Sequence, residues 1–313
     1  MTLQVWNTVP ATCSIGTPSS MDLVNQLAAI ILPVLVVPAI GFAWARSGQG
    51  FDNRFITQLV TNIGTPALTA DALTRIHLES GALVQMAGLT ALCFLGFAVL
   101  GTIVLRVMKL PNHSYLPALM FPNTGNMGLP LAFFAFGDEG LAFAVVFFAI
   151  SITSQFTIGM SLAAGSFSLR RLARMPMIYA LAVAIFFLAS GIKVPPYLGN
   201  TLQLLGGLTI PLMLLALGVS LAQLRVTRLP RNLLLSLVRL AGGAAIGFLV
   251  GFFSGASDLA IGVLMIQSTM PVAVFNYLFA QYYNREPADV ASMVVITTAL
   301  SFITLPVLLY LVL

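Results

Sequence analysis

Apolar stretches of about 20 residues follow one another along nearly the whole chain. A helix of that length crosses about 30 Å of hydrocarbon, and only helices or closed barrels satisfy their backbone hydrogen bonds in lipid. Hydrophobic residues make up 59% and charged residues 7% of the 313 positions, which leaves too little polar surface to cover a water-soluble core. The sequence therefore predicts an all-α polytopic membrane protein, since a barrel would show short alternating segments instead.

Charges and turn residues divide the apolar stretches into ten expected spans. Residues 1–21 form a polar N-terminal tail that contains no Lys or Arg, so we expect no cleavable signal peptide there. The connecting segments are too short to hold a soluble domain. The expected spans are residues 22–46, 53–74, 80–108, 114–136, 139–166, 174–191, 197–222, 230–255, 258–284 and 288–312.

Basic residues are distributed unevenly between the two sets of connecting segments. The segments after the first, third, fifth, seventh and ninth spans hold eleven Lys and Arg residues, whereas the opposite segments hold two. Because positive residues favour the cytoplasmic side, we expect the first set to be cytoplasmic and both termini to be non-cytoplasmic. The net charge of +5 follows from these loops, so we discard binding to nucleic acid.

A near-constant offset relates the two halves of the sequence. Pro66 and Pro211 lie 145 positions apart, as do Met120 and Met265, and a third match has an offset of 146. Five spans per half is an odd number, so the two halves should be inverted relative to each other in the membrane. The expected domains are a first five-helix repeat at 22–166, a basic cytoplasmic linker at 167–173 and a second five-helix repeat at 174–313.

Two spans carry prolines and polar residues where an ordinary lipid-facing helix would be continuous. The fourth span reads LPALMFPNTGNMGLPLAFFAFG and the ninth reads VLMIQSTMPVAVFNYLFAQYY. Proline removes a helix hydrogen bond and glycine adds backbone freedom, so both spans should unwind near mid-membrane. Broken helices in matching places of two inverted halves are typical of transporter binding sites. The candidate substrate-binding residues are Pro122, Asn123, Thr124, Asn126, Gln267, Ser268, Thr269, Pro271 and Asn276.

Each of these features also has a plainer interpretation. Polar neighbours can simply cap a proline kink, and polar residues in apolar helices often bond to other helices. Asp71, Gln155 and Arg239 are candidate coupling or anion-attracting residues. Alternatively, Asp71 pairs with Arg75 on the same helix face, and Arg239 extends its guanidinium to the cytoplasmic interface.

The sequence contains no recognisable constellation for catalysis or for a resident metal. His77 and His113 lie near opposite membrane faces, and Cys13 and Cys93 are far apart in the chain. No zinc-protease, nucleophile-elbow or phosphate-loop motif occurs. We therefore expect neither an enzyme nor a cofactor.

Several motifs, in their order and spacing, resemble those of the auxin efflux carrier family, the bacterial relatives of the plant PIN transporters. The clearest are FPNTGNMGLPLAFFAFGDEG, PVAVFNYLFAQYYNREP and TTALSFITLP. The resemblance extends over residues 22–313 and implies a ten-helix inverted repeat in which the fourth and ninth spans cross at their prolines. It also implies that an organic carboxylate binds at Pro122, Asn123 and Pro271. The long central loop of the plant proteins is absent here.

These features predict a secondary transporter that moves a small organic anion across a bacterial inner membrane by alternating access. The resemblance implies a carboxylate, auxin-like or a dicarboxylate; bacterial members of the family are linked to malonate and other small acids, and the sequence does not choose among them. The expected partners are this anion and the lipid bilayer, while coupling to protons or sodium, and a homodimer, are left open. The alternatives are a sodium-coupled organic-anion symporter of the bile-acid symporter type, and a non-transporting ligand sensor or channel.

Overall fold

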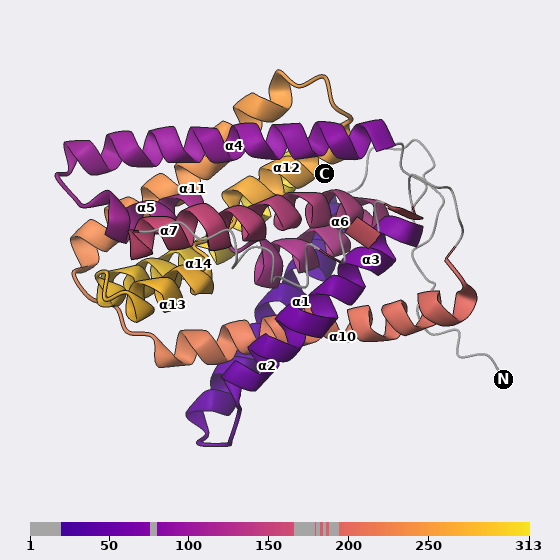
Figure 1. The fold of residues 1–313 in the computed structure, drawn as a ribbon, viewed down its shortest axis with the longest axis horizontal. Helices are drawn as coiled ribbons and strands as arrows, with labels where there is room; N and C mark the ends of the chain where they lie inside the picture. The colour runs from indigo at the N-terminus through magenta and orange to yellow at the C-terminus, as the bar shows by residue number, and fades with distance from the viewer. Residues whose placement is uncertain (1–19, 76–79, 166–178, 180–181, 184–185, 188–193) are drawn as a thin grey trace.

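The computed structural model describes residues 20–75, 80–165, 179, 182–183, 186–187 and 194–313 (Figure 1). This part of the chain is helical and contains no β-strand, only an isolated antiparallel bridge between Pro122 and Val272. Three segments labelled η are π-helices. The elements are α1 (Ser20–Arg46), α2 (Asn53–Leu59), η1 (Val60–Gly64), α3 (Thr65–Arg75), α4 (Ser80–Val107), α5 (Asn112–Met120), η2 (Thr124–Gly128), α6 (Leu129–Ser154), η3 (Gln155–Gly159), α7 (Met160–Ala164), α10 (Pro196–Gln223), α11 (Leu229–Phe252), α12 (Asp258–Thr269), α13 (Val274–Tyr282) and α14 (Pro287–Val312).

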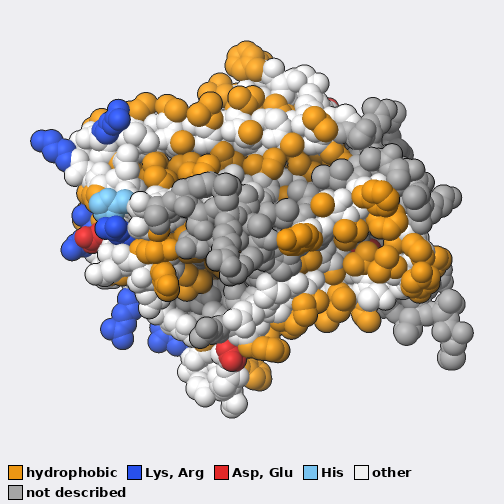
Figure 2. Space-filling view, in the orientation of Figure 1, with side chains coloured by type: hydrophobic (Ala, Val, Ile, Leu, Met, Phe, Trp, Pro, Cys, Tyr) orange, Lys and Arg blue, Asp and Glu red, His pale blue; other side chains and the backbone are white. Residues whose placement is uncertain are grey.

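Six helical stretches of the described chain are long and apolar enough to cross a membrane by length and composition. On α4, Leu92 and Leu95 are exposed, whereas Met86 and Cys93 are fully buried. Figure 2 shows hydrophobic side chains over much of the visible face and Lys and Arg side chains gathered at its left end. An apolar outer surface with basic ends suits lipid, and it confirms the expected class of all-α polytopic membrane protein. The six stretches are Leu27–Arg46, Gly81–Val107, Thr124–Ala164, Pro196–Gln223, Leu229–Phe252 and Pro287–Val312.

Most helix ends lie close to the expected span boundaries. The fourth and fifth expected spans meet inside α6, where Gly137 has φ 64° and ψ −152°, a conformation that breaks the helix and that glycine adopts readily. The stretch from Thr124 to Ala164 therefore changes direction between the two expected spans. Most of the sixth expected span, 174–191, lies outside the described residues. The count of ten spans accordingly stays a prediction.

The described helices pack in two sets. α1 lies along α10, which also contacts α3, while α11 contacts α4, α12 and α14. α6 contacts members of both sets. In Figure 1, α4 and α11 lie toward the upper edge, α2 and α10 lie toward the lower edge, and α6 runs between them. The segments that interrupt the fourth and ninth expected spans, 121–123 and 270–273, are buried in this interior.

Aromatic side chains surround the first of these interruptions. Phe121 is fully buried, and its ring centroid lies 5.6 Å from that of Phe94 on α4. Phe94 also lies 5.6 Å from Phe97 and 5.8 Å from Phe147 of α6. Such pairs contribute about 0.5–1.5 kcal/mol each beyond the burial of their surface. This packing stabilises the unwound segment, which is buried away from water.

Candidate functional site

The two helix breaks meet and hydrogen-bond to each other. The amide of Asn123 donates to the carbonyl of Pro271 at 2.7 Å, and the amide of Ala273 donates to the carbonyl of Phe121 at 3.2 Å. Proline has no N–H and a fixed φ, so helix bonding stops at Pro122 and Pro271 and leaves backbone groups without partners. The bridge satisfies these groups inside the membrane, where an unpaired polar group is costly.

Side chains complete the bonding around the breaks. Asn276 donates from Nδ2 to the carbonyl of Phe121 at 2.9 Å and accepts at Oδ1 from Nε2 of Gln155 at 2.8 Å. The hydroxyl of Thr297 accepts from the amide of Val272 at 3.0 Å. Gln155 begins η3 and Thr297 lies on α14, so these bonds connect the breaks to two further helices.

A cavity of about 340 Å³ lies against the breaks. All three described π-helices contribute to its wall, and such segments often occur at functional sites. None of the described residues that line it is charged. Its polar lining residues are Asn53, Thr57, Thr61, Asn62, Thr65, Asn123, Thr124, Asn126, Gln155, Ser220, Gln223 and Tyr277. Its larger apolar lining residues are Phe148, Ile152, Phe156, Met160, Met213, Leu224, Phe275 and Leu278.

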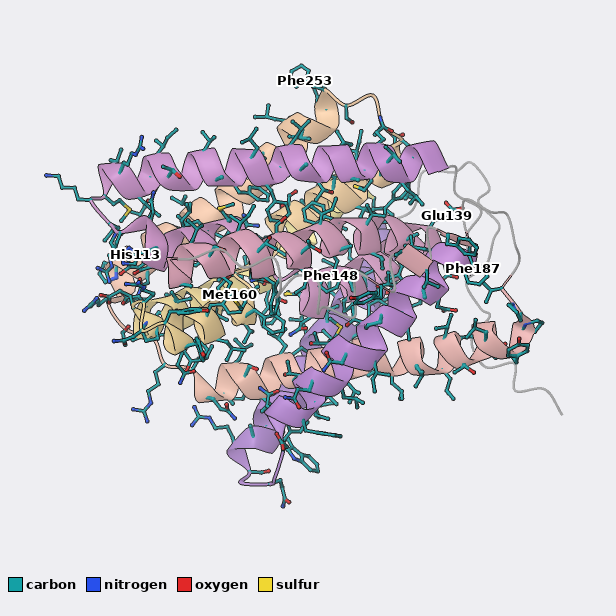
Figure 3. All side chains as sticks on the ribbon, viewed as in Figure 1. His113, Glu139, Phe148, Met160, Phe187 and Phe253 are labelled. Carbon is teal, nitrogen blue, oxygen red and sulfur yellow. The ribbon has the colours of Figure 1, made fainter. Side chains whose placement is uncertain are left out.

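The cavity extends from the interior toward the basic end of the molecule. In Figure 3, Phe148 lies near the middle, Met160 lies closer to the end that holds His113, and Glu139 lies at the opposite end. Asn53 begins α2 and Gln223 ends α10, so both lie at helix ends beside basic connecting segments.

Asn123 lines this cavity and carries a hydrogen-bond donor without a partner in the part of the chain that the structure describes. Its side chain is buried, with 4% of the residue exposed, and its Nδ2 has no hydrogen-bond partner among the described residues. Gly125, Asn126, Val274 and Phe275 also line the cavity, and they lie in the first turns of η2 and α13. The first amides of a helix have no acceptor within that helix. The wall of the cavity therefore includes the N-termini of two helices and a residue whose side-chain amide nitrogen is unpaired in the described structure.

The structure separates the expected binding residues into two groups. Those that line the cavity are Pro122, Asn123, Thr124, Asn126 and Gln155. Those that do not line it are Gln267, Ser268, Thr269, Pro271, Asn276, Asp71 and Arg239. On the ninth expected span the cavity is lined by residues after the break, on α13, whereas four of the expected residues lie at or before the break. The backbone amides of Asn123 and Ala273 are not free to bind a ligand, because both donate across the bridge.

Three of the remaining residues lie at the end of α12. Gln267 is fully buried with its amide against Gly128, and its side-chain oxygen and nitrogen have no partner in the described chain. Ser268 lies near Cys93, with 3.6 Å between Oγ and Sγ, and Thr269 donates to the carbonyl of Met265 at 2.8 Å. They therefore belong to the packing behind the breaks.

Arg239 lies behind the breaks and does not reach the interface, to which the alternative interpretation expected it to extend. It is 2% exposed, so its guanidinium does not extend to the interface, and it does not line the cavity. Its Nη1 donates to the carbonyl of Leu119 at 3.3 Å and its Nη2 to that of Ser268 at 2.7 Å. Asp71 is half-buried on α3, and the side chain of Arg75 lies outside what the structure describes.

Part of the cavity wall lies on α2, η1 and α10, outside the residues expected from the sequence. Asn53, Thr57 and Thr61 recur every fourth residue, so they share one helix face in the second expected span. That spacing was available in the sequence, although it does not reveal which face meets a cavity. Ser220 accepts a hydrogen bond from Nδ2 of Asn53 at 2.9 Å, which joins α10 to α2 at the wall.

A separate polar cluster lies at the basic end and was also missed. Asp289 is 1% exposed and accepts hydrogen bonds from Tyr115 at 2.6 Å, from Arg228 at 3.0 Å, and from Arg231 and Asn232. Attraction to the Asp289 carboxylate raises the pKa of the Arg228 guanidinium above its ordinary value. Tyr115 lies in α5, so the cluster ties α5 to α11 and α14.

No group of three or more His, Cys, Asp or Glu residues in the described chain could hold a metal ion. The family model described as "Membrane transport protein" matches residues 159–309. An uncharacterized transporter of Methanocaldococcus jannaschii is 22% identical over 88% of this chain and 96% of its own length. Another, of Methanothermobacter thermautotrophicus, is 25% identical over 88% and 95%. A Rhizobium meliloti protein named "Putative malonate transporter" is 23% identical over 92% and 96%.

The chain therefore has a helical fold with apolar stretches long enough to span a membrane, and it is similar to membrane transport proteins. The resemblance to the auxin efflux carrier family, which the motifs around the two breaks indicated, is thereby confirmed.

Proposed function

We propose that the chain is a secondary transporter in which ten spans form two inverted five-helix halves, residues 22–166 and 174–313. A small organic anion binds where the two broken helices meet. The bridge supports this arrangement because each break donates one amide and accepts at one carbonyl. A two-fold relation between the halves would produce such reciprocal bonding.

The observation that carries the proposal is the buried, unpartnered amide of Asn123 on the cavity wall. Leaving a buried donor unpaired costs about 1–3 kcal/mol, and an acceptor on a bound molecule removes that cost. The N-termini of η2 and α13 lie on the same cavity, and helix N-termini favour negative charge. These donors suit a carboxylate.

Arg239 adds positive charge behind the breaks. Leu119 and Ser268, whose carbonyls it binds, each lie three residues before the proline of their break. Charges act over longer distances where little water screens them. The cavity should therefore favour an anion over a cation.

The mixed wall indicates a molecule with one charged end and an apolar body. Asn123 and Asn126 lie near the breaks, while Phe148, Phe156 and Met213 offer apolar surface to the same space. This pattern favours an auxin-like monocarboxylate. The relative named for malonate favours a dicarboxylate instead, so the two classes are to be compared directly.

The direction in which the cavity extends supports an inward-facing state. Its mouth lies at the ends of α2 and α10 beside basic segments, which we expect to be cytoplasmic. Transport then requires a second state in which the same site opens to the other side. We place the protein in the bacterial inner membrane with both termini non-cytoplasmic.

Counterflow in proteoliposomes tests the proposal. Vesicles preloaded with indole-3-acetate or malonate should take up the same radiolabelled acid saturably, and the monocarboxylate should be preferred. Flux that never saturates would indicate a channel, and binding without flux would indicate a sensor. Repeating uptake with and without sodium, and with a pH gradient, separates the sodium-symporter alternative from proton coupling.

A further inference from the structure

Arg239 is a positive charge buried in a membrane-spanning helix. It lies on α11, is 2% exposed, and forms no ion pair with any described residue. Charges at such depth are costly and normally have a function that retains them. The cavity lining does not include it, so direct contact with substrate is not that function.

Its two partners are equivalent groups on two different helices. Leu119 lies in the last turn of α5 and Ser268 in the last turn of α12. The last four carbonyls of a helix lack partners within it and carry partial negative charge. One guanidinium therefore caps the C-terminal ends of both half-helices that lead into the breaks.

The surroundings hold this guanidinium in one place. It stacks over the ring of Phe97 on α4, 4.6 Å from the ring centroid. Gly243, one turn further along α11, has no side chain where the carbonyl of Ser268 comes close, and any larger residue there would clash with it. The planar fork of arginine can serve two acceptors at once, which the single ammonium of lysine does less well.

We propose that Arg239 is a positioning residue that fixes the two helix breaks against each other by capping the carbonyl ends of α5 and α12 together. This inference rests on the proposed function, since the breaks it fixes form the wall of the proposed binding site. Arg239 therefore acts on the bound anion through the geometry of the bridge between Pro122 and Val272.

Hydrogen exchange of the purified protein tests this without any substrate. Arg239→Met substitutes an unbranched apolar side chain and removes both N–H donors to the carbonyls of Leu119 and Ser268. Exchange measured by mass spectrometry in the segments 118–126 and 268–276 should then rise together by about tenfold. Segments of α1 and α10 should keep their wild-type rates. Arg239→Lys should give an intermediate rise in the same two segments.

Leu240→Ala provides the matched control. Leu240 is buried on α11 next to Arg239, but its side chain points to another face of the helix. Leu240→Ala should lower the melting temperature without raising hydrogen exchange in both break segments. The proposal would be overturned by any of three results. Exchange in Arg239→Met could equal that of the wild type, the rise could be spread evenly over all helices, or Arg239→Lys could keep full protection. If Arg239→Met does not fold, comparing exchange in the two break segments between Arg239→Lys and Leu240→Ala tests the proposal in the same way.

Uptake of indole-3-acetate or malonate then separates this inference from the proposed function. If neither acid is transported by the wild type, the exchange result still stands and only the function fails. If one is transported, Arg239→Lys should raise its half-saturation concentration more than it lowers the maximal rate.

Discussion

The amide of Asn123 donates a hydrogen bond of 2.7 Å to the carbonyl of Pro271, and the amide of Ala273 donates in return to the carbonyl of Phe121. Each broken helix therefore supplies a backbone partner to the other. The backbone of Asn123 is occupied by this bond, while its side-chain Nδ2 remains without a partner on the cavity wall. One residue therefore joins the architecture of the breaks to the proposed binding site.

Asn123→Ala should weaken binding of the transported acid roughly ten- to a hundredfold, because a hydrogen bond to a charged group contributes about 1.5–3 kcal/mol. The backbone bond to Pro271 survives, so folding should be preserved. Half-saturation concentration in proteoliposomes measures the effect. Gln223→Ala, at the mouth of the same cavity, is the control and should stay near wild type; equal effects of the two substitutions would contradict the assignment.

Pro271→Ala should also lower affinity, although no charge changes. Its new N–H can bond to the carbonyl of Gln267 and extend α12 by one residue, which moves the carbonyl that Asn123 uses. We expect a higher half-saturation concentration and slower exchange at 268–271. Wild-type affinity with slowed exchange would mean that the break does not shape the site.

Asp289→Asn should destabilise the protein. Removing the charge weakens the hydrogen bonds that the buried carboxylate accepts from Tyr115 and Asn232 and its pairing with Arg231, and hydrogen bonds to a charged group contribute about 1.5–3 kcal/mol. A thermal melt in detergent measures the loss. Glu286→Gln alters only the exposed pair with Arg228 and should melt close to wild type. Similar melting temperatures for both variants would refute the role of this cluster.

Asp71→Asn should leave transport measurable. Asp71 lies on α3 away from the cavity lining, so we expect at most a modest loss of stability, about 0–1 kcal/mol for a surface-type pair. Flux driven by a pH gradient is the measurement. If proton-driven flux disappears at normal expression, Asp71 is the coupling site and this prediction is wrong.

Single cysteines should report the expected orientation. Lys109 and Glu139 are replaced by Cys, one at a time, in a background in which Cys13 and Cys93 are Ser. Position 109 follows α4 in a basic segment, and Glu139 lies at the opposite end of the molecule (Figure 3). An impermeant maleimide added to intact cells should label position 139 only. Labelling of position 109 instead would reverse the topology.

Sequence patterns located the two breaks because their causes are local. Pro122 and Pro271 cannot donate helix bonds, and each break occurs where the proline lies. The division between the fourth and fifth expected spans likewise coincides with Gly137, a residue that tolerates a positive φ.

The placement of side chains around the breaks could not be predicted from the sequence. Gln267 belongs to the broken span as expected, yet its amide packs against Gly128. The spacing of Asn53 does not show which helix its face meets, and Asn53 and Ser220 meet on the cavity wall only because α2 packs beside α10.

By itself the sequence determined the membrane class, the helix breaks and the chemistry of the residues beside them, because hydropathy and proline geometry act within one segment. Only the tertiary structure decided that Asn123 lies on the cavity wall and that Arg239 binds the carbonyls of two helix ends behind it. The rotation of each helix about its axis depends on which neighbours pack against it. That packing joins residues more than a hundred positions apart, such as Leu119 and Arg239.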